Sequence, residues 1–198
     1  MNKDIEFFNK CAANWDAIRT TSPSKLLTLL QKADIKSGST VLDVGSGTGV
    51  LLPYLASAIG NGGRITAVDF SANMLNIARE KYAHLGSIDF VTGDILELPL
   101  VDNAYDAITC LNFYPHLNQR KKEFLQRMLA KLKPGGKLII MHDISRAQVN
   151  GIHGTCDEVK EHRLPAAEVT QRLLNECGYA NTTAFENDEM YFVSGEKQ

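Results

Sequence analysis

The chain has 198 residues, of which 44% are hydrophobic and 22% are charged, as is typical of one globular domain with a sizeable core. It has 21 lysines and arginines and 23 aspartates and glutamates, which gives a formal net charge of −2. That balance argues against a nucleic-acid-binding protein, which usually has a basic face. It is compatible with a small-molecule partner.

The amino terminus and the cysteines bear on the compartment. The first ten residues, MNKDIEFFNK, are charged and lack the apolar core of a secretory signal, and no apolar run approaches the roughly 20 residues of a membrane span. The four cysteines form no CxxC pair, and their spacing matches no disulfide framework. We therefore expect a cytoplasmic protein with reduced thiols and no membrane partner. The sequence does not distinguish a monomer from a homodimer.

Residues 1–36 are expected to form a helical cap. Phe8, Cys11, Trp15 and Ile18 recur at steps of three and four residues, which is typical of one apolar stripe on an amphipathic helix. A second, leucine-rich helix should follow, because a proline stands in its first turn and a glycine follows its last.

Residues 41–49, VLDVGSGTG, combine an apolar run with three closely spaced glycines. The run is typical of a strand buried on both faces of a parallel sheet. Gly45, Gly47 and Gly49 allow positive φ and let a ligand lie against backbone N–H groups. A helix that begins near Thr48 would point the positive end of its dipole at the same place. The stretch therefore predicts a turn that binds a nucleotide-like ligand.

The spacing of these glycines departs from the dinucleotide fingerprint. That fingerprint reads GxGxxG or GxGxxA, whereas here Val50 stands at the third position. A second strand, residues 64–68, leads to Asp69, twenty positions after Gly49. An acidic residue at the end of this strand can accept hydrogen bonds from both ribose hydroxyls of a nucleoside.

The remaining elements alternate between helices and strands. Helices are expected at 50–59, 71–82, 118–132 and 165–177, and strands at 88–92, 105–111, 137–141, 179–185 and 190–194. The turn LKPGG precedes the fifth strand, and residues 145–164, which are polar and without period, should form an irregular lid segment. The pattern predicts an α/β fold, a Rossmann-like seven-stranded and mostly parallel sheet with helices on both faces and a C-terminal antiparallel hairpin.

These motifs resemble those of class I S-adenosylmethionine-dependent methyltransferases, in the small-molecule group that includes the ubiquinone and menaquinone methyltransferases. The first motif of that family matches Asp43, Gly45, Gly47 and Gly49, the second matches Asp69, and LKPGG is one of its diagnostic strings. The resemblance implies one domain over residues 1–198 and the strand order 3-2-1-4-5-7-6. It also implies S-adenosylmethionine as cofactor and S-adenosylhomocysteine as product.

The resemblance further implies which residues bind that cofactor. In the family an N-terminal helix closes over it, and an aromatic residue before an aspartate lines the methionine end, which matches Trp15 and Asp16. Asp94 would lie near the adenine amino group and Ile95 against the ring. Asp94 could instead be a turn former, but its position after a third strand favours the functional role. Met74 would face the glycine turn or belong to the core. The cofactor-binding candidates are Trp15, Asp43, Gly45, Ser46, Gly47, Gly49, Asp69, Phe70, Met74, Asp94, Ile95 and Asn112.

Candidate catalytic residues follow from the ends of the fourth and fifth strands. Ligands of open α/β sheets bind beyond the carboxyl ends of the strands, where the strand order reverses. Methyl transfer from a sulfonium needs alignment and exclusion of water, and a base only if the acceptor loses a proton. Imidazole titrates near neutrality, so His116, His142 and His153 are the candidates. Each could instead be a hydrogen-bonded structural histidine.

Three alternatives stay open at this point. His153, Cys156 and His162, with His116 and His142, could bind a borderline metal ion or a metalloid substrate. The spacings HxxC and CxxxxxH match no standard zinc signature, so we assign no metal ligand. The others are a non-catalytic S-adenosylmethionine-binding protein and a nicotinamide oxidoreductase, which the missing third glycine disfavours. The lid segment lacks a long apolar stretch, which argues against a bulky prenylated acceptor. We therefore predict a methyltransferase with an unidentified small-molecule acceptor.

Overall fold

The computed structural model describes residues 2–198, and their side chains from Asp4 onward. The chain divides into two compact units, residues 1–98 and residues 99–198. Within the residues described, none of the helices has the length and apolar character that crossing a bilayer requires. That the whole chain acts as one domain stays a prediction.

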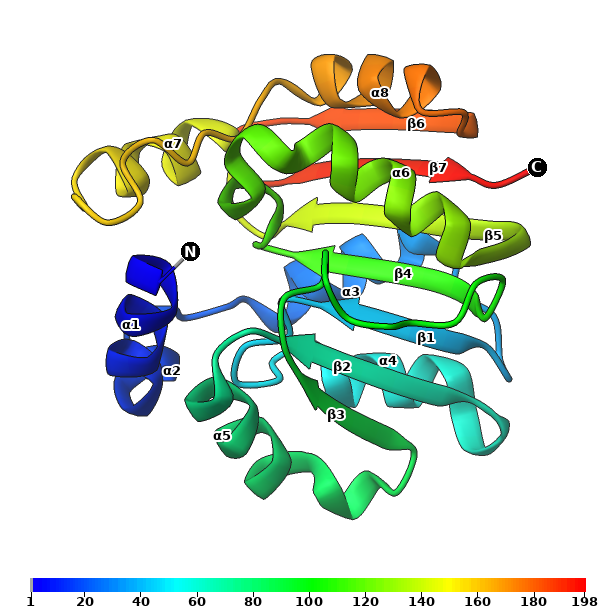
Figure 1. The fold of residues 1–198 in the computed structure, drawn as a ribbon, viewed down its shortest axis with the longest axis horizontal. Helices are drawn as coiled ribbons and strands as arrows, with labels where there is room; N and C mark the ends of the chain where they lie inside the picture. The colour runs from blue at the N-terminus through cyan, green and yellow to red at the C-terminus, as the bar shows by residue number, and fades with distance from the viewer. Residues whose placement is uncertain (1) are drawn as a thin grey trace. The chain divides into compact units, whose positions relative to one another are not determined.

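The first unit contains a parallel sheet with the strand order β3-β2-β1. Its elements are α1 (Asn2–Cys11), η1 (Ala12–Asn14), α2 (Trp15–Ile18), α3 (Pro23–Ala33), β1 (Thr40–Val44), α4 (Leu52–Ile59), η2 (Gly60–Gly62), β2 (Arg64–Asp69), α5 (Ala72–Tyr82), η3 (Ala83–Leu85) and β3 (Ile88–Thr92). Helix α4 packs against β1 and β2, and α5 packs against β2 and β3 (Figure 1).

Strand β1 is buried along nearly all of its length, as its apolar run predicts. Val41, Leu42 and Val44 are each at most 1% exposed. Side chains of successive strand residues point to opposite faces of a sheet, so this strand is covered on both faces. The rigid strand fixes the position of the glycine turn that follows it.

The N-terminal segment differs from the single amphipathic helix that its apolar spacing predicts. Helix α1 ends at Cys11, and the 3₁₀ turn η1 separates it from the short α2. A 3₁₀ helix has three residues per turn instead of 3.6. The apolar residues before and after η1 therefore no longer lie on one face. Phe8 stays buried, whereas Ile18 is 62% exposed. The prediction of one stripe through Ile18 was wrong.

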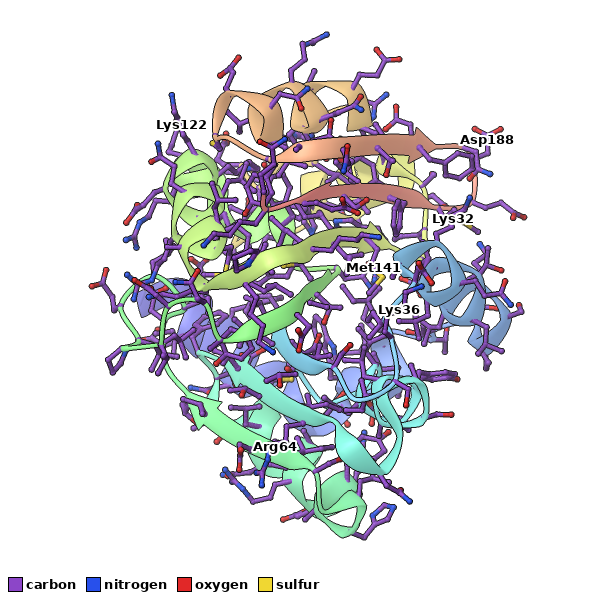
Figure 2. The ribbon with its side chains drawn as sticks, turned by 90° about the vertical axis from the view of Figure 1, so that its right-hand side faces the viewer. Lys32, Lys36, Arg64, Lys122, Met141 and Asp188 are labelled. Carbon is purple, nitrogen blue, oxygen red and sulfur yellow. The ribbon has the colours of Figure 1, made fainter. Side chains whose placement is uncertain are left out.

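The second unit contains a mixed sheet with the order β4-β5-β7-β6. Its elements are β4 (Tyr105–Leu111), η4 (Tyr114–Arg120), α6 (Lys121–Lys131), β5 (Leu132–His142), α7 (Arg146–Gly154), α8 (Ala167–Glu176), β6 (Ala180–Glu186) and β7 (Tyr191–Glu196). Strands β4 and β5 are parallel, and β7 pairs antiparallel with both β5 and β6. Figure 2 shows Lys122 on α6 and Asp188 in the turn between β6 and β7. Within each unit the strand order is the predicted one.

Two boundaries of the second unit differ from those expected. Helix α6 begins at Lys121 rather than near 118, because Asn118 has φ 47° and ψ −116°, which no helix accommodates. The LKPGG string lies inside β5 rather than before it, since the pairing with β4 shifts register between Tyr105 and Ala107. A bulge of this kind bends a strand without ending it.

The lid segment, residues 145–164, is partly helical rather than irregular throughout. Ser145 and Gln148 form a capping box, in which the Ser145 hydroxyl accepts from the Gln148 N–H and the Gln148 side chain accepts from the Ser145 N–H. Two N–H groups that a helix leaves unsatisfied at its start are thereby bound. Helix α7 follows, beyond the carboxyl ends of β4 and β5 (Figure 1).

Candidate active site

The glycine turn after β1 has the backbone geometry that only glycine adopts easily. Gly45, Gly47 and Gly49 have φ values of 70°, 54° and 86°. A Cβ on Gly49 would lie 2.9 Å from atoms of Leu52 and Tyr82, so this glycine permits close packing. A Cβ on Gly47 would have Trp15 Nε1 as its nearest neighbour, at 4.0 Å. No atom therefore crowds Gly47 on the side where a Cβ would project, and the Trp15 side chain lies next to that space. Helix α4 begins at Leu52, later than expected.

Asp69 lies at the end of β2, beside this turn. Its Oδ2 accepts from the Gly47 N–H at 2.9 Å and its Oδ1 accepts from the Ser71 N–H at 2.8 Å. The side chain is buried, and desolvation raises its pKa to about 6 although these N–H donors oppose the rise. The Phe70 N–H also acts on this carboxylate, and because a carboxylate has about four lone-pair sites, Asp69 can still accept from a hydroxyl group of a ligand.

The interior of the turn is held by its own polar groups. The Ser46 hydroxyl donates to the Asp43 carbonyl oxygen at 2.9 Å, and Asp43 is 2% exposed.

After β3, Asp94 Oδ1 accepts from the Leu96 N–H at 2.9 Å, as expected for a turn former. Ile95 is buried beside it. Contacts of Asp94 and Ile95 with adenine stay predictions.

The N-terminal segment is attached to both loops of the candidate cofactor site. The Thr48 hydroxyl donates to Asp16 Oδ1 at 2.6 Å, and the Lys81 ammonium donates to the other oxygen of the same carboxylate. The Ser71 hydroxyl hydrogen-bonds with Asn9 Oδ1 at 2.7 Å. Asp16 and Asn9 therefore connect the segment to the glycine turn and to the start of α5.

An aromatic cluster reinforces this attachment. The Phe8 ring packs edge-on against Trp15 and Phe70, at centroid distances of 5.5 and 5.6 Å. Met74 is 1% exposed within the same cluster. Of the two interpretations of Met74, core packing is observed, and a contact with the cofactor stays a prediction. Trp15 and Phe70 border the cluster and are only partly buried.

In the second unit, Asn112 and Asp143 follow the neighbouring strands β4 and β5. Asn112 has φ 57°, and its N–H donates to the Met141 carbonyl oxygen at 2.9 Å (Figure 2 labels Met141 near the end of β5). Its Nδ2 donates to Asp143 Oδ1 at 2.8 Å. The carboxylate accepts only, so the Asn112 amide oxygen must point elsewhere. That oxygen is buried and, within the described residues, accepts no hydrogen bond.

The candidate catalytic histidines fall into two groups. His116 lies in η4 and His153 in α7, with ring centroids 5.0 Å apart. His162, which sequence reasoning did not place among the catalytic candidates, lies 5.3 Å from the His116 ring. His142 is buried at the end of β5, and its ring packs edge-on against Tyr191 at 5.6 Å. The structure thus brings together His116, His153 and His162.

Among the described residues, the histidines that lie near Cys156 in sequence form no metal site. Across residues 4–198, no three His, Cys, Asp or Glu side chains are arranged to hold a metal ion. Cys156 contacts a carboxylate instead, its Sγ donating to Glu158 Oε2 at 3.2 Å. A Cys156 thiol that donates to an acid is not in the deprotonated form that binds metals.

Comparisons with known proteins identify the family of the chain. A family model described as a methyltransferase domain matches residues 41–136. The ubiquinone/menaquinone biosynthesis C-methyltransferase UbiE of Pseudomonas paraeruginosa (strain DSM 24068 / PA7) is 31% identical over 147 residues, which cover 70% of this chain and 57% of that relative. The chain belongs to the class I S-adenosylmethionine-dependent methyltransferase family. It spans 57% to 66% of the length of the curated relatives it matches.

Solved structures share the fold over most of the chain. A SAM-dependent methyltransferase from Aquifex aeolicus is 25% identical with a TM-score of 0.71, covering 88% of this chain and 93% of that one. The structure of a DhpI–SAH complex is 23% identical with a TM-score of 0.76, covering 99% of this chain and 96% of that one. The predicted Rossmann-like, seven-stranded and mostly parallel methyltransferase fold with a C-terminal antiparallel hairpin is confirmed.

Proposed function

We propose that this methyltransferase-family chain transfers a methyl group from S-adenosylmethionine to a small-molecule acceptor in the cytoplasm. The observation that carries the proposal is the pairing of an open glycine backbone with a buried acid. The Gly47 N–H donates to Asp69, and a Cβ at Gly47 would meet no atom closer than 4.0 Å. A nucleoside with two adjacent hydroxyls and a polar tail fits this combination.

The residues present suit the cofactor that the family uses. Asp69 would accept the ribose hydroxyls, because a buried carboxylate whose pKa desolvation has raised gains from further donors. The backbone from Gly45 to Gly49 would hold the amino-acid tail, with Trp15 next to it. Asp94 and Ile95 would contact the adenine. When bound, the cofactor supplies an electrophilic methyl group on a positively charged sulfur.

The second unit would supply the groups that handle the acceptor. His116, His142 and His153 are the candidates for taking a proton from the methyl acceptor. The buried amide oxygen of Asn112 can accept a hydrogen bond from a ligand. Burying an acceptor without a partner costs about 1 to 3 kcal/mol, so a ligand donor at Asn112 would recover that cost. In this proposal the protein aligns the acceptor and excludes water, which are the main needs of an in-line displacement.

The decisive experiment supplies methyl-labelled S-adenosylmethionine and a protein-free extract of small metabolites. We expect label to pass into a low-molecular-weight product with the wild type. Asp69→Ala should lose this transfer, and Asp89→Ala, which changes an exposed acid on the neighbouring strand, should keep it. Tight cofactor binding with no transfer of label to any component of a metabolite extract would instead mark a non-catalytic binding protein.

A further inference from the structure

Three of the five histidines of the chain meet in the second unit. The ring of His116 lies 5.0 Å from that of His153 and 5.3 Å from that of His162. They come from η4, from α7 and from the segment that follows α7, which lies beyond the carboxyl ends of β4 and β5 (Figure 1). His162 is 7% exposed, whereas the other two rings are partly exposed.

The hydrogen bond of His153 fixes where its proton lies. Its Nδ1 contacts the backbone carbonyl oxygen of His162. A carbonyl oxygen only accepts, so Nδ1 of His153 must carry the hydrogen. A neutral imidazole has one N–H, and Nε2 of His153 is therefore the unprotonated nitrogen.

The contact between His116 and His162 allows two arrangements. Their Nδ1 atoms are 3.1 Å apart, so one donates and the other accepts. If His116 donates, its Nε2 is unprotonated, as in His153, and His162 accepts from both neighbours. If His162 donates, Nε2 of His116 carries the hydrogen and cannot take up a proton. The first arrangement is the one that leaves Nε2 of the partly exposed His116 unprotonated.

We infer that His162 is a positioning residue that holds His116 and His153 as Nδ1–H tautomers, so that both rings offer Nε2 as a proton acceptor. A buried residue thus orients two more exposed rings, through its ring nitrogen and its backbone carbonyl. A partner that fixes a tautomer in this way is what a general base needs.

The inference rests on the proposed methyl transfer and narrows its substrate class. The acceptor atom carries a proton, as an N–H, an O–H or an acidified C–H does. As its electron pair bonds to the methyl carbon, the carbon–sulfur bond breaks and its electrons stay on sulfur. The proton of the acceptor passes to Nε2 and then to water. The positive charge of the sulfonium is thereby transferred to the imidazole, and atoms and charge balance.

Nitrogen-15 NMR of the full-length labelled protein tests the tautomers directly. Spectra recorded at about pH 8, above the ordinary imidazole pKa of ~6.5, separate protonated from unprotonated ring nitrogens. We expect His116 and His153 to show a protonated Nδ1 and an unprotonated Nε2. His84, which is exposed, is the reference for a ring solvated by water. A protonated Nε2 on His116 or on His153 would overturn the inference.

Two variants separate the ring of His162 from its backbone. In His162→Leu the ring acceptor is lost and the carbonyl is kept, so His116 should revert to the tautomer of His84 while His153 keeps its own. In His162→Asn a polar atom stays at the δ position, so His116 should keep Nδ1–H. An unchanged His116 in His162→Leu contradicts the inference. If that variant does not fold, the wild-type spectrum and His162→Asn decide.

Calorimetry with S-adenosylhomocysteine distinguishes the two proposals. The affinity of both variants for this ligand should match that of the wild type. A wild type that binds it but shows the opposite tautomers overturns the role of His162 and leaves the proposed function standing. A wild type that ignores it overturns the proposed function and, with it, this inference.

Discussion

At the scale of single residues, the candidate cofactor site depends on one buried carboxylate and on two glycines with different neighbours. Asp69 accepts from the N–H groups of Gly47 and Ser71. A Cβ on Gly47 would come no closer than 4.0 Å to another atom, Nε1 of Trp15, whereas one on Gly49 would lie 2.9 Å from Leu52 and Tyr82. Asp69 and Gly47 therefore belong to the proposed ligand site, whereas Gly49 is needed for packing. Each role can be tested by substitution.

Asp69→Ala should weaken the binding of S-adenosylhomocysteine by roughly 1.5 to 3 kcal/mol, the scale of hydrogen bonds to charged groups. The loss follows because alanine accepts nothing from the ribose hydroxyls. Isothermal calorimetry measures the effect, with Asp89→Ala as the matched control on an exposed strand position. Equal affinities of wild type and Asp69→Ala would count against the role of this acid.

The binding affinity should also depend on pH through Asp69. Burial raises its pKa to about 6 from 3.8, so its ionisation costs folding stability as the pH rises through that window. Ribose hydroxyls donate to the ionised form. Affinity should therefore fall roughly tenfold between about pH 7 and pH 5, where a group with this pKa becomes mostly protonated. In Asp69→Asn the dependence should flatten, and calorimetry at each pH would refute the idea if both proteins behaved alike.

Alanine at the two glycines should have different effects. Both positions have positive φ, which costs an alanine about 1 to 2 kcal/mol. Gly49→Ala adds contacts of 2.9 Å and should destabilise the fold further, whereas Gly47→Ala adds no close contact and should mainly lower cofactor affinity. Urea unfolding and calorimetry on both variants measure the two effects. Gly47→Ala with full affinity would show that no ligand lies against that backbone.

Much of the candidate cofactor site in the first unit could be predicted from the sequence, residue by residue. The glycines and Asp69 are spaced along the sequence in a way that predicts both the turn and the acid beside it. The attachment of Asn9 to Ser71 and of Asp16 to Thr48 spans 62 and 32 positions, so no local pattern announces it. Sequence reasoning grouped His162 with His116, 46 positions earlier, only as possible metal ligands, and no local pattern announces the contact between their rings.

At the scale of elements, helix α7 shows what a local signal can predict. Hydrophobic periodicity gave no helix in residues 145–164, because only Val149 of α7 is buried. The start of that helix was nevertheless present in the sequence as Ser145 and Gln148, three positions apart. A capping box is a local signal, and its use would have corrected the prediction of an irregular segment.

Removing this cap should destabilise α7 measurably. Ser145→Ala leaves the Gln148 N–H without its side-chain acceptor, at a cost of about 1 kcal/mol. Hydrogen exchange of the amides in α7 should accelerate, because a fraying helix exposes them. Ser57→Ala, at an exposed position inside α4, is the control and should have little effect. Unchanged exchange in Ser145→Ala would show that packing alone holds the helix.

The strands were predicted better than the helix ends. Strands β3 and β4 occupy the expected residues, because each is a short, strongly patterned run. The start of α6 was missed because Asn118 takes a non-helical conformation with positive φ, which residue type only weakly signals. The N-terminal helix was misjudged because the 3₁₀ turn at Ala12–Asn14 changes the period without a proline or glycine.

At the scale of the whole molecule, the sequence motifs, the fold and the relatives all indicate the same family. The matched region, residues 41–136, begins at β1 and includes Asp69. The identity of the acceptor depends instead on parts of the chain whose local pattern gives little information, such as the lid segment and the histidines. Local pattern is weak there, and only the folded structure brings the three rings together.

The central claim is tested most directly by thermal unfolding of the full-length protein with S-adenosylhomocysteine. A ligand at a hundred times its Kd adds about 2.7 kcal/mol to the free energy of unfolding. For a chain of this size that corresponds to a rise in Tm of about 5 to 10 °C. We predict such a rise, with NADH producing none. A Tm that stays constant with S-adenosylhomocysteine at millimolar concentration would contradict the account.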